Sequence, residues 1–185
     1  MTVTTTELSA LTGTWALDPA HTRIGFSAKH AMVATVRGAF GVFDGTLVLD
    51  GENPAKSTAQ VSIDSASVDT GNADRDTHVR SGDFLDVEAF PKLSFVSTDV
   101  RIDGDDFELV GDLTVKDVTR SVTIKVETEG IVADPWGNTR AGFSGETTIS
   151  RKDFGLTWNV ALEAGGILVG DKVKITLDVS AVKQA

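Results

Sequence analysis

The sequence predicts an all-β domain of about eight antiparallel strands, closed as a barrel or packed as a sandwich. Apolar and polar residues alternate along most of the chain, which is typical of strands with one buried face. Turn-forming pairs such as Asp50-Gly51 and Asp134-Pro135 separate the alternating segments. One segment, residues 72–86, breaks this rhythm and favours a short helix followed by a turn.

The alternating segments follow one another at the short spacing of strands that are joined by hairpins. In chain order, their apolar residues are Ile24 and Phe26; Leu47 and Leu49; Val61 and Ile63; Leu93 and Phe95; Phe107, Leu109, Leu113 and Val115; Val122, Ile124 and Val126; Phe143 and Ile149; and Val173, Ile175, Leu177 and Val179. Because alternate side chains share one face of a strand, we expect this apolar set to face the interior. In particular, we expect the side chains of Phe26, Phe40, Phe95, Leu113 and Phe143 to point into the barrel.

The helix expected within residues 72–86 is short, since it begins after Asn72 and stops near Gly82. Asn72 is a good N-cap, and the acidic residues Asp74 and Asp76 in the first turn suit the helix dipole. Asp76 is spaced to pair with Arg80 one turn later. Because Val79 is its main large apolar residue, we expect this helix and the turn after it to cover one end of the barrel.

Size and charge limit the domain organisation and the partners. The chain has 185 residues, 41% of them apolar, which suits one folded domain, and it shows no repeat or linker. We expect a short N-terminal extension at residues 1–13 and a single barrel domain at residues 14–183. The net charge of −10 disfavours nucleic acid and anionic lipid surfaces, because both bind clustered Lys and Arg.

The compartment is predicted from what the chain lacks. It contains no cysteine, which excludes disulfides, thiolate metal sites and cysteine nucleophiles. Residues 1–14 carry neither the basic start nor the apolar stretch of a signal peptide. No segment approaches the roughly 20 apolar residues of a membrane-spanning helix. We therefore expect a soluble cytoplasmic protein that is not integral to a membrane.

The residues that could carry catalysis form no coherent motif. The histidines His21, His30 and His78 match none of the usual zinc-ligand spacings. The segment Gly142-Phe143-Ser144-Gly145 lacks the spacing of a nucleophile elbow, and Gly165–Gly170 lacks the dinucleotide fingerprint. We therefore expect no catalytic residue, no metal and no cofactor. The interior of an eight-stranded barrel can be filled by side chains or hold one ligand, and periodicity does not distinguish these states.

A set of local motifs closely resembles the YceI-like family of polyisoprenoid-binding proteins. In order, they are Trp15-Ala-Leu-Asp-Pro-Ala-His21, Ile24-Gly-Phe26, His30, Arg37-Gly-Ala-Phe40, Phe43-Asp-Gly45, Asp69-Thr-Gly-Asn72, Arg75-Asp-Thr-His78, Ser81-Gly-Asp-Phe84-Leu-Asp86, Phe90-Pro-Lys-Leu-Ser-Phe95, Gly111-Asp-Leu-Thr114 and Ser150-Arg-Lys-Asp-Phe154-Gly155. The resemblance extends from about residue 14 to residue 182 and depends on no single motif.

The resemblance implies an extended lipocalin-like barrel, with a short helix or two near an end, that holds a long isoprenoid chain in its pore. It implies a carrier or store of a polyprenyl pyrophosphate or an isoprenoid quinone, without catalytic activity. The apolar residues expected in the pore are Phe26, Phe40, Phe43, Val61, Phe84, Phe95, Leu113, Phe143, Phe154 and Trp158. The candidates for binding the head group are His30, Arg37, Arg75 and His78.

Several alternatives stay open at this point. Arg37, Arg75 and Arg80 suit a pyrophosphate, yet they could equally pair with nearby aspartates and brace the fold. A quinone would need only hydrogen-bond donors. Other functions are a structural or stress-related barrel that acts through a protein partner, and a hydrolase that uses His78 with Asp76. A homodimer is also compatible with the sequence.

Overall fold

The computed structural model describes residues 5–103 and 106–185, and within them the alternating segments form one antiparallel sheet. Residues 1–4 of the expected N-terminal extension lie outside the described residues. The strands are β1 (Gly13–Leu17), β2 (Arg23–His30), β3 (Ala34–Phe40), β4 (Phe43–Leu49), β5 (Thr58–Asp64), β6 (Val68–Asp69), β7 (Lys92–Asp103), β8 (Asp106–Val115), β9 (Val118–Ala133), β10 (Thr139–Ser150) and β11 (Val169–Lys183).

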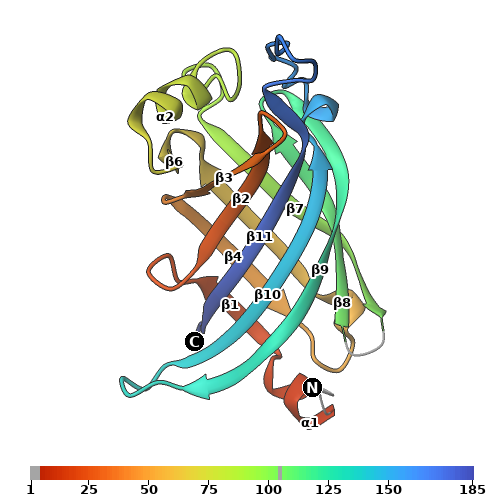
Figure 1. Cartoon of the computed structure of the whole chain (residues 1–185). Coiled ribbons are helices and arrows are strands. Elements are labelled where there is room, and N and C mark those ends of the chain that lie inside the picture. Colours follow the sequence, from red (N-terminus) through yellow and green to blue (C-terminus); the bar gives the residue numbers. More distant parts are fainter. Residues whose placement is uncertain (1–4, 104–105) are drawn as a thin grey trace.

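Eight of the strands in these residues close into a barrel, as the sequence predicts (Figure 1). Their order around the ring is β1-β4-β5-β7-β8-β9-β10-β11, and β11 pairs with β1 to complete it. At the closure Trp15 of β1 lies opposite Lys183 of β11, and Leu17 lies opposite Ala181. This closure pairs β1 and β11, which would otherwise be the edge strands of the eight-stranded ring.

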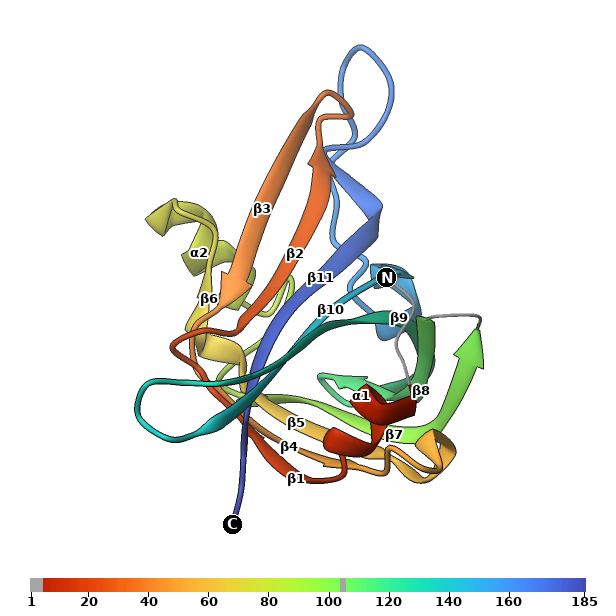
Figure 2. The same cartoon turned by 90° about the horizontal axis from the view of Figure 1, so that it is seen from below.

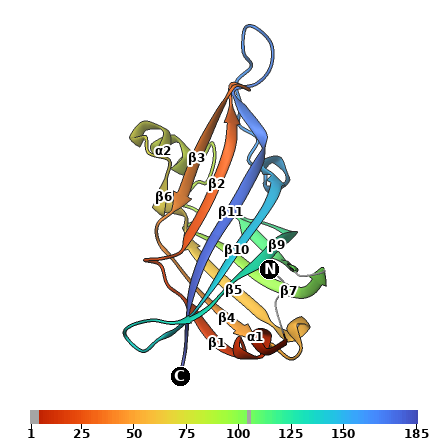
Figure 3. The same ribbon diagram turned by 60° about the horizontal axis from the view of Figure 1, so that its bottom comes forward.

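The remaining strands extend the wall at one end. The long strand β11 pairs with β1 only at residues 181–183, and along residues 169–178 it pairs with β2 instead. Strands β3 and β6 continue the sheet beyond β2, so that β2, β3 and β6 form a flap beside the ring (Figure 3).

The two ends of the barrel carry different connections, and Figure 1 shows them at the top and bottom of the molecule. The upper end carries the β2–β3 turn at residues 31–33, helix α2 (Ala73–Arg80) and the segment at residues 151–168. The lower end carries helix α1 (Thr5–Ala10), residues 50–57 and the β9–β10 turn at residues 134–138. No helix in the described part of the chain is long and apolar enough to cross a membrane.

Three short 3₁₀ helices also occur in the described part of the chain: η1 (Pro54–Lys56), η2 (Ser65–Ser67) and η3 (Arg151–Phe154). At the lower end Trp15 is fully buried, and its indole Nε1 donates a hydrogen bond of 2.7 Å to the carbonyl of Leu11. This bond ties the chain between α1 and β1 to the start of the barrel. The view from below shows α1 lying across the ring of strands at this end (Figure 2).

Helix α2 begins where its sequence predicts, because the side chain of Asn72 accepts a hydrogen bond from the Arg75 amide at 2.9 Å. The expected ion pair between Asp76 and Arg80 is wrong. The buried Asp76 carboxylate accepts bonds from the amide and hydroxyl of Thr70 at 2.8 and 2.6 Å. Arg80 donates instead to the backbone carbonyls of residues 66 and 68, which fastens α2 to β6.

Candidate ligand-binding site

A cavity of about 750 Å³ runs through the barrel. Its wall begins at Leu8 in α1 and reaches Trp158 and Leu168 at the upper end. This volume lies within the range of about 300–1,000 Å³ that is typical of ligand sites. The interior is therefore hollow, which periodicity alone left undecided.

The wall of the cavity is built by the alternation along the strands. On β11, the side chains of Val173, Ile175, Leu177 and Val179 face the cavity, whereas Lys174, Thr176 and Asp178 alternate with them along the strand and are not part of its wall. The same alternation on β8 and β9 contributes Phe107, Leu109, Leu113, Val115, Val122, Ile124 and Val126. The result is an almost continuous hydrocarbon surface along the length of the barrel.

Two glycines explain how large aromatic residues line this space without filling it. Gly38 lies directly opposite Phe26, and a Cβ atom added to Gly38 would lie 2.5 Å from Cζ of the Phe26 ring. A Cβ atom added to Gly111 would lie 2.4 Å from Cζ of Phe95. Each ring therefore lies over the backbone of the neighbouring strand, where only glycine leaves room for it.

Most residues that the sequence assigns to the pore lie on the cavity wall. They are Phe26, Phe40, Val61, Phe84, Phe95, Leu113, Phe143, Phe154 and Trp158. Phe43 does not line the cavity. It lies opposite Ile63 in the sheet and is buried in the hydrophobic core, with 7% of its surface exposed.

Polar side chains line the wall at both ends: Asp50, Ser57 and Thr58 at the lower end, and a group that includes charged residues at the upper end, between β2 and α2. His30 and Lys29 of β2 line the cavity there, together with Asp74 and Arg75 of α2. His30 and Lys29 are also exposed, so the cavity meets solvent at this point, which we call the mouth. Arg37, the remaining head-group candidate, is not part of this wall. It lies opposite Ser27 and one position before Gly38, so strand alternation turns it away from the cavity.

His78 of α2 packs into an aromatic group at the mouth. Its ring makes edge-on contacts with Trp158 and Phe84, at centroid distances of 4.5 and 5.0 Å. Its Nε2 atom is 2.8 Å from the Asp83 carboxylate. Arg75 is fixed as well, since its guanidinium donates to the hydroxyl and the carbonyl of Thr70 at 2.7 and 2.8 Å. The mouth therefore combines aromatic rings with polar side chains whose positions are fixed by hydrogen bonds.

Arg151 is a residue of the wall to which the sequence assigned no role. Only 4% of its surface is exposed, and no carboxylate lies within ion-pair distance of it among the described residues. Its guanidinium donates to the carbonyls of Leu156, Trp158, Val169 and Gly170 at 2.8 to 3.2 Å. Burial lowers the pKa of Arg151. The signal available in the sequence was its place within the motif at residues 150–155.

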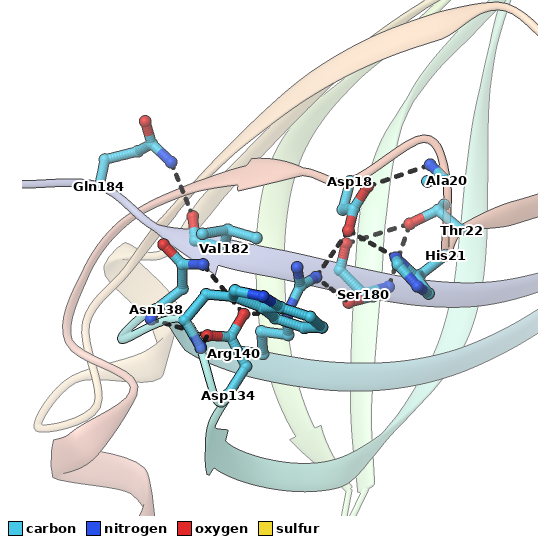
Figure 4. A network of polar contacts seen from close by, with 11 residues as sticks. Asp18, Ala20, His21, Thr22, Asp134, Asn138, Arg140, Ser180, Val182 and Gln184 are labelled. Carbon is cyan, nitrogen blue, oxygen red and sulfur yellow. Dashed lines mark hydrogen bonds and ion pairs between the residues drawn. The ribbon is translucent and has the colours of Figure 1, made fainter.

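A second polar cluster lies at the lower end, away from the cavity (Figure 4). Arg140 donates to Asp18 at 2.6 Å and to Asp134 at 2.8 Å, and His21 binds the same Asp18 carboxylate at 2.7 Å. Hydrogen bonds from Arg140 and then from His21 lower the pKa of Asp18 to about 2. The bond from Asn138 is the largest of several that lower the pKa of Asp134. This cluster braces the bend between β1 and β2 against β10.

Within residues 5–103 and 106–185, no group of three or more His, Asp or Glu side chains is placed to hold a metal ion. His21 belongs to the lower cluster, whereas His30 and His78 lie at the mouth. The histidines are therefore not brought together.

Comparison with known proteins places the fold in a family. The YceI-like domain model matches residues 15–181. The protein YceI of Escherichia coli is 40% identical over 164 residues, which cover 89% of this chain and 83% of that protein. BcnA of Burkholderia cenocepacia superposes with a TM-score of 0.75 at 26% identity, over 89% of this chain and 98% of that one. A polyisoprenoid binding domain from Saccharophagus degradans, implicated in plant cell wall breakdown, has the same fold, with a TM-score of 0.69 at 16% identity over 92% and 98% of the two chains.

Proposed function

The chain belongs to the YceI-like family, and we propose that its barrel binds a long-chain polyisoprenoid as a carrier or store. The observation that carries this proposal is the apolar cavity that follows the barrel from α1 to the mouth. The domain from Saccharophagus degradans, which shares the fold, is a polyisoprenoid binding domain and supports the same ligand class.

The physical chemistry of such a ligand suits this wall. Each CH₂ group removed from water contributes about 0.8 kcal/mol, so one five-carbon unit contributes roughly 3–4 kcal/mol before losses. Ordering of the chain and incomplete burial offset much of this gain. A cavity of this kind therefore binds a hydrocarbon chain tightly with few polar contacts, and its length and shape set the specificity.

We place the polar head of the ligand at the mouth, where Arg75, His78 and His30 line the cavity. Arg151 adds a buried positive charge to the same end of the wall. A pyrophosphate would draw on Arg75, whereas a quinone would need only a donor such as His78. An Arg75→Ala variant should therefore lose pyrophosphate binding much more than quinone binding.

The direct test is to extract the folded protein with organic solvent and to identify any lipid by mass spectrometry. Stripped protein is then offered prenyl chains of decreasing length. We expect affinity to fall by about tenfold for each isoprene unit removed, over the lengths that the cavity holds. No uptake at any length would overturn the proposal and would favour a barrel that acts through a protein partner.

We also propose that the protein binds this lipid without converting it. His78 is engaged by Asp83 and by two aromatic rings, and Asp76 is held by Thr70, so these two residues do not act on each other as the hydrolase alternative requires. Incubation with ester and phosphate substrates, with and without divalent metal, should give no turnover. A rate that depended on His78 would contradict this.

A further inference from the structure

The upper end of the molecule carries a group of exposed apolar side chains beside the mouth. We call this group the tip. Its members are Met32, at 64% exposure, Val33 at 85%, Val160 at 47% and Ile167 at 38%. Figures 2 and 3 show the β2–β3 turn and the loop before β11 projecting beyond the barrel, so the tip is the most protruding part of this end.

The two segments of the tip form one surface. The amide of Ala31 donates to the carbonyl of Leu168 at 2.7 Å. The side chain of Met32 reaches Gly166, where an added Cβ atom would lie 2.4 Å from its sulfur. Within the loop, the amide of Leu168 donates to the carbonyl of Val160 at 2.9 Å, which holds the loop as a folded-back hairpin.

Charged residues are nearly absent from the tip and its flanks. In the whole chain 24% of residues are charged and the net charge is −10. By contrast, residues 31–36 contain no charged side chain, and residues 154–170 contain only Glu163. An acidic protein that keeps one protruding end neutral and apolar has a surface suited to an uncharged, hydrophobic partner.

The tip also adjoins the cavity wall. His30, Trp158 and Leu168 line the cavity, and each is within two residues of a member of the tip. Apolar surface therefore continues from the exposed tip into the interior.

We propose that the tip inserts into the surface of a lipid bilayer, so that a polyisoprenoid passes between the bilayer and the cavity without crossing water. The cargo in this statement rests on the proposed function. A bilayer fits the tip better than a protein does, because four convex side chains supply only part of the roughly 800 Å² per partner that a stable protein interface buries. Shallow insertion of apolar side chains needs no such area.

The charge of the molecule sets the preferred lipid. A net charge of −10 is repelled by anionic head groups, so binding should be stronger to vesicles of pure phosphatidylcholine than to vesicles that also contain phosphatidylglycerol. Raising the salt concentration should reduce this difference.

The test compares the wild-type protein with a V33D/I167D double variant, which places two charges on the tip. The matched control is V132D, because Val132 is 62% exposed and lies on β9 toward the lower end. Flotation with phosphatidylcholine vesicles measures docking without any cargo. Transfer of a fluorescent prenyl lipid between donor and acceptor vesicles measures whether docking speeds the exchange of lipid with the bilayer. Uptake of a short prenyl chain from solution measures whether the cavity still binds its ligand.

We expect the double variant to lose vesicle flotation and to transfer lipid at least about tenfold more slowly, with unchanged uptake from solution, while V132D behaves as wild type. Wild-type protein that fails to float, or a double variant that floats and transfers normally, would overturn the proposal. A tip that instead joins two copies of the chain, seen as a dimer that V33D/I167D dissociates, would also overturn it. Flotation without uptake of any prenyl chain would refute the proposed function and leave the docking surface standing.

Discussion

At the scale of single residues, two arginines perform opposite tasks in this barrel. Arg140 neutralises two carboxylates at the lower end, and both partners of each pair keep some contact with solvent. Arg151 is buried at the upper end and is satisfied by four backbone carbonyls rather than by a carboxylate. Because carboxylates titrate, the ion pairs of Arg140 make the stability of the fold depend on pH. The carbonyls bound by Arg151 do not titrate, so their contribution depends on the presence of the Arg151 side chain.

The pH dependence has a sign that follows from the lowered pKa of Asp18. The unfolded chain protonates this carboxylate near the ordinary value of 3.8, whereas the folded barrel protonates it only near 2. The stability that the Arg140–Asp18 contact contributes is therefore complete above pH 3.8 and is lost as the pH falls toward about 2.

An Arg140→Ala variant should bring the pKa of Asp18 from about 2 back toward 3.8, because it removes the largest cause of the shift. NMR titration of the Asp18 carboxyl carbon measures this directly. The variant should be less stable than wild type above pH 3.8, and the difference should shrink at lower pH. Arg101→Ala is the control, since its pair with Asp99 is exposed and should be worth less than about 1 kcal/mol. An unchanged Asp18 pKa would refute this account.

An Arg151→Met variant should lower the free energy of unfolding by about 3–5 kcal/mol, because it removes a buried donor from four carbonyls, of which only that of Val169 keeps a second side-chain donor, the amide of Asn159. Amide exchange should increase across residues 155–169. The neighbouring Lys152 is exposed, so Lys152→Met should change stability by no more than about 0.5 kcal/mol. Denaturation in urea distinguishes the two, and equal stability of both variants would show that the carbonyls find other donors.

At the scale of elements, the parts that the sequence could predict are those governed by neighbours along the chain. The alternation on β11 and the N-cap of α2 were both correct, because strand phase and capping are local. The partner of Asp76 was not predictable in this way, since Thr70 precedes the helix and offers both an amide and a hydroxyl. Arg37 could have been placed correctly from Phe40, because residues three apart on a strand face opposite sides.

The register between neighbouring strands of the barrel is harder to predict from the sequence. Whether Phe26 and Phe95 fill the lumen depends on which residues lie beside them on the next strand, and glycines at 38 and 111 occupy those places. The four hydrogen bonds of Arg151 likewise depend on how residues 155–170 return to β11. Both features come from pairings between distant segments, which local patterns do not encode.

A Gly111→Ala variant tests the role of glycine under an aromatic ring. The added methyl group would meet the Phe95 ring and the Val96 carbonyl, so the ring must move into the cavity. We expect a loss of about 1–3 kcal/mol in unfolding free energy and weaker binding of the longest prenyl chains. Gly82→Ala is the control, because an added Cβ atom there meets nothing within 4 Å. A Gly111→Ala protein with wild-type stability and binding would contradict this account.

Helix α2 and the turn after it should be protected when a ligand is bound. Arg75, His78 and Phe84 line the cavity at the mouth, so a bound ligand should contact them. We expect slower amide hydrogen exchange across residues 73–86 when a prenyl chain is bound. Unchanged exchange in this segment, with protection elsewhere in the barrel, would argue that it does not act as a lid.

In the molecule as a whole, the eight-stranded ring accounts both for the closed sheet and for the cavity inside it. Eight strands make a ring whose interior is just wide enough for side chains or one small ligand, and here glycines let the large rings lie against the wall. The chain as a whole carries a net charge of −10, whereas the tip beside the mouth carries exposed apolar side chains. Binding capacity is therefore a property of the complete barrel and not of one cluster of residues.

If the whole barrel binds the ligand, a narrower cavity should accept only shorter prenyl chains and should still bind those. Leu109 of β8 lines the cavity below the mouth, and Leu109→Trp adds bulk there. We expect the longest prenyl chain that is bound to become shorter by about one or two isoprene units, while chains that already fit keep their affinity within about threefold. Val96→Trp is the matched control, because Val96 lies on the neighbouring strand with 44% of its surface exposed to solvent. Binding isotherms for a series of chain lengths measure both effects. An equal loss of affinity at every length would mean that the substitution acts through stability, and no change at any length would mean that the chain does not lie along this wall.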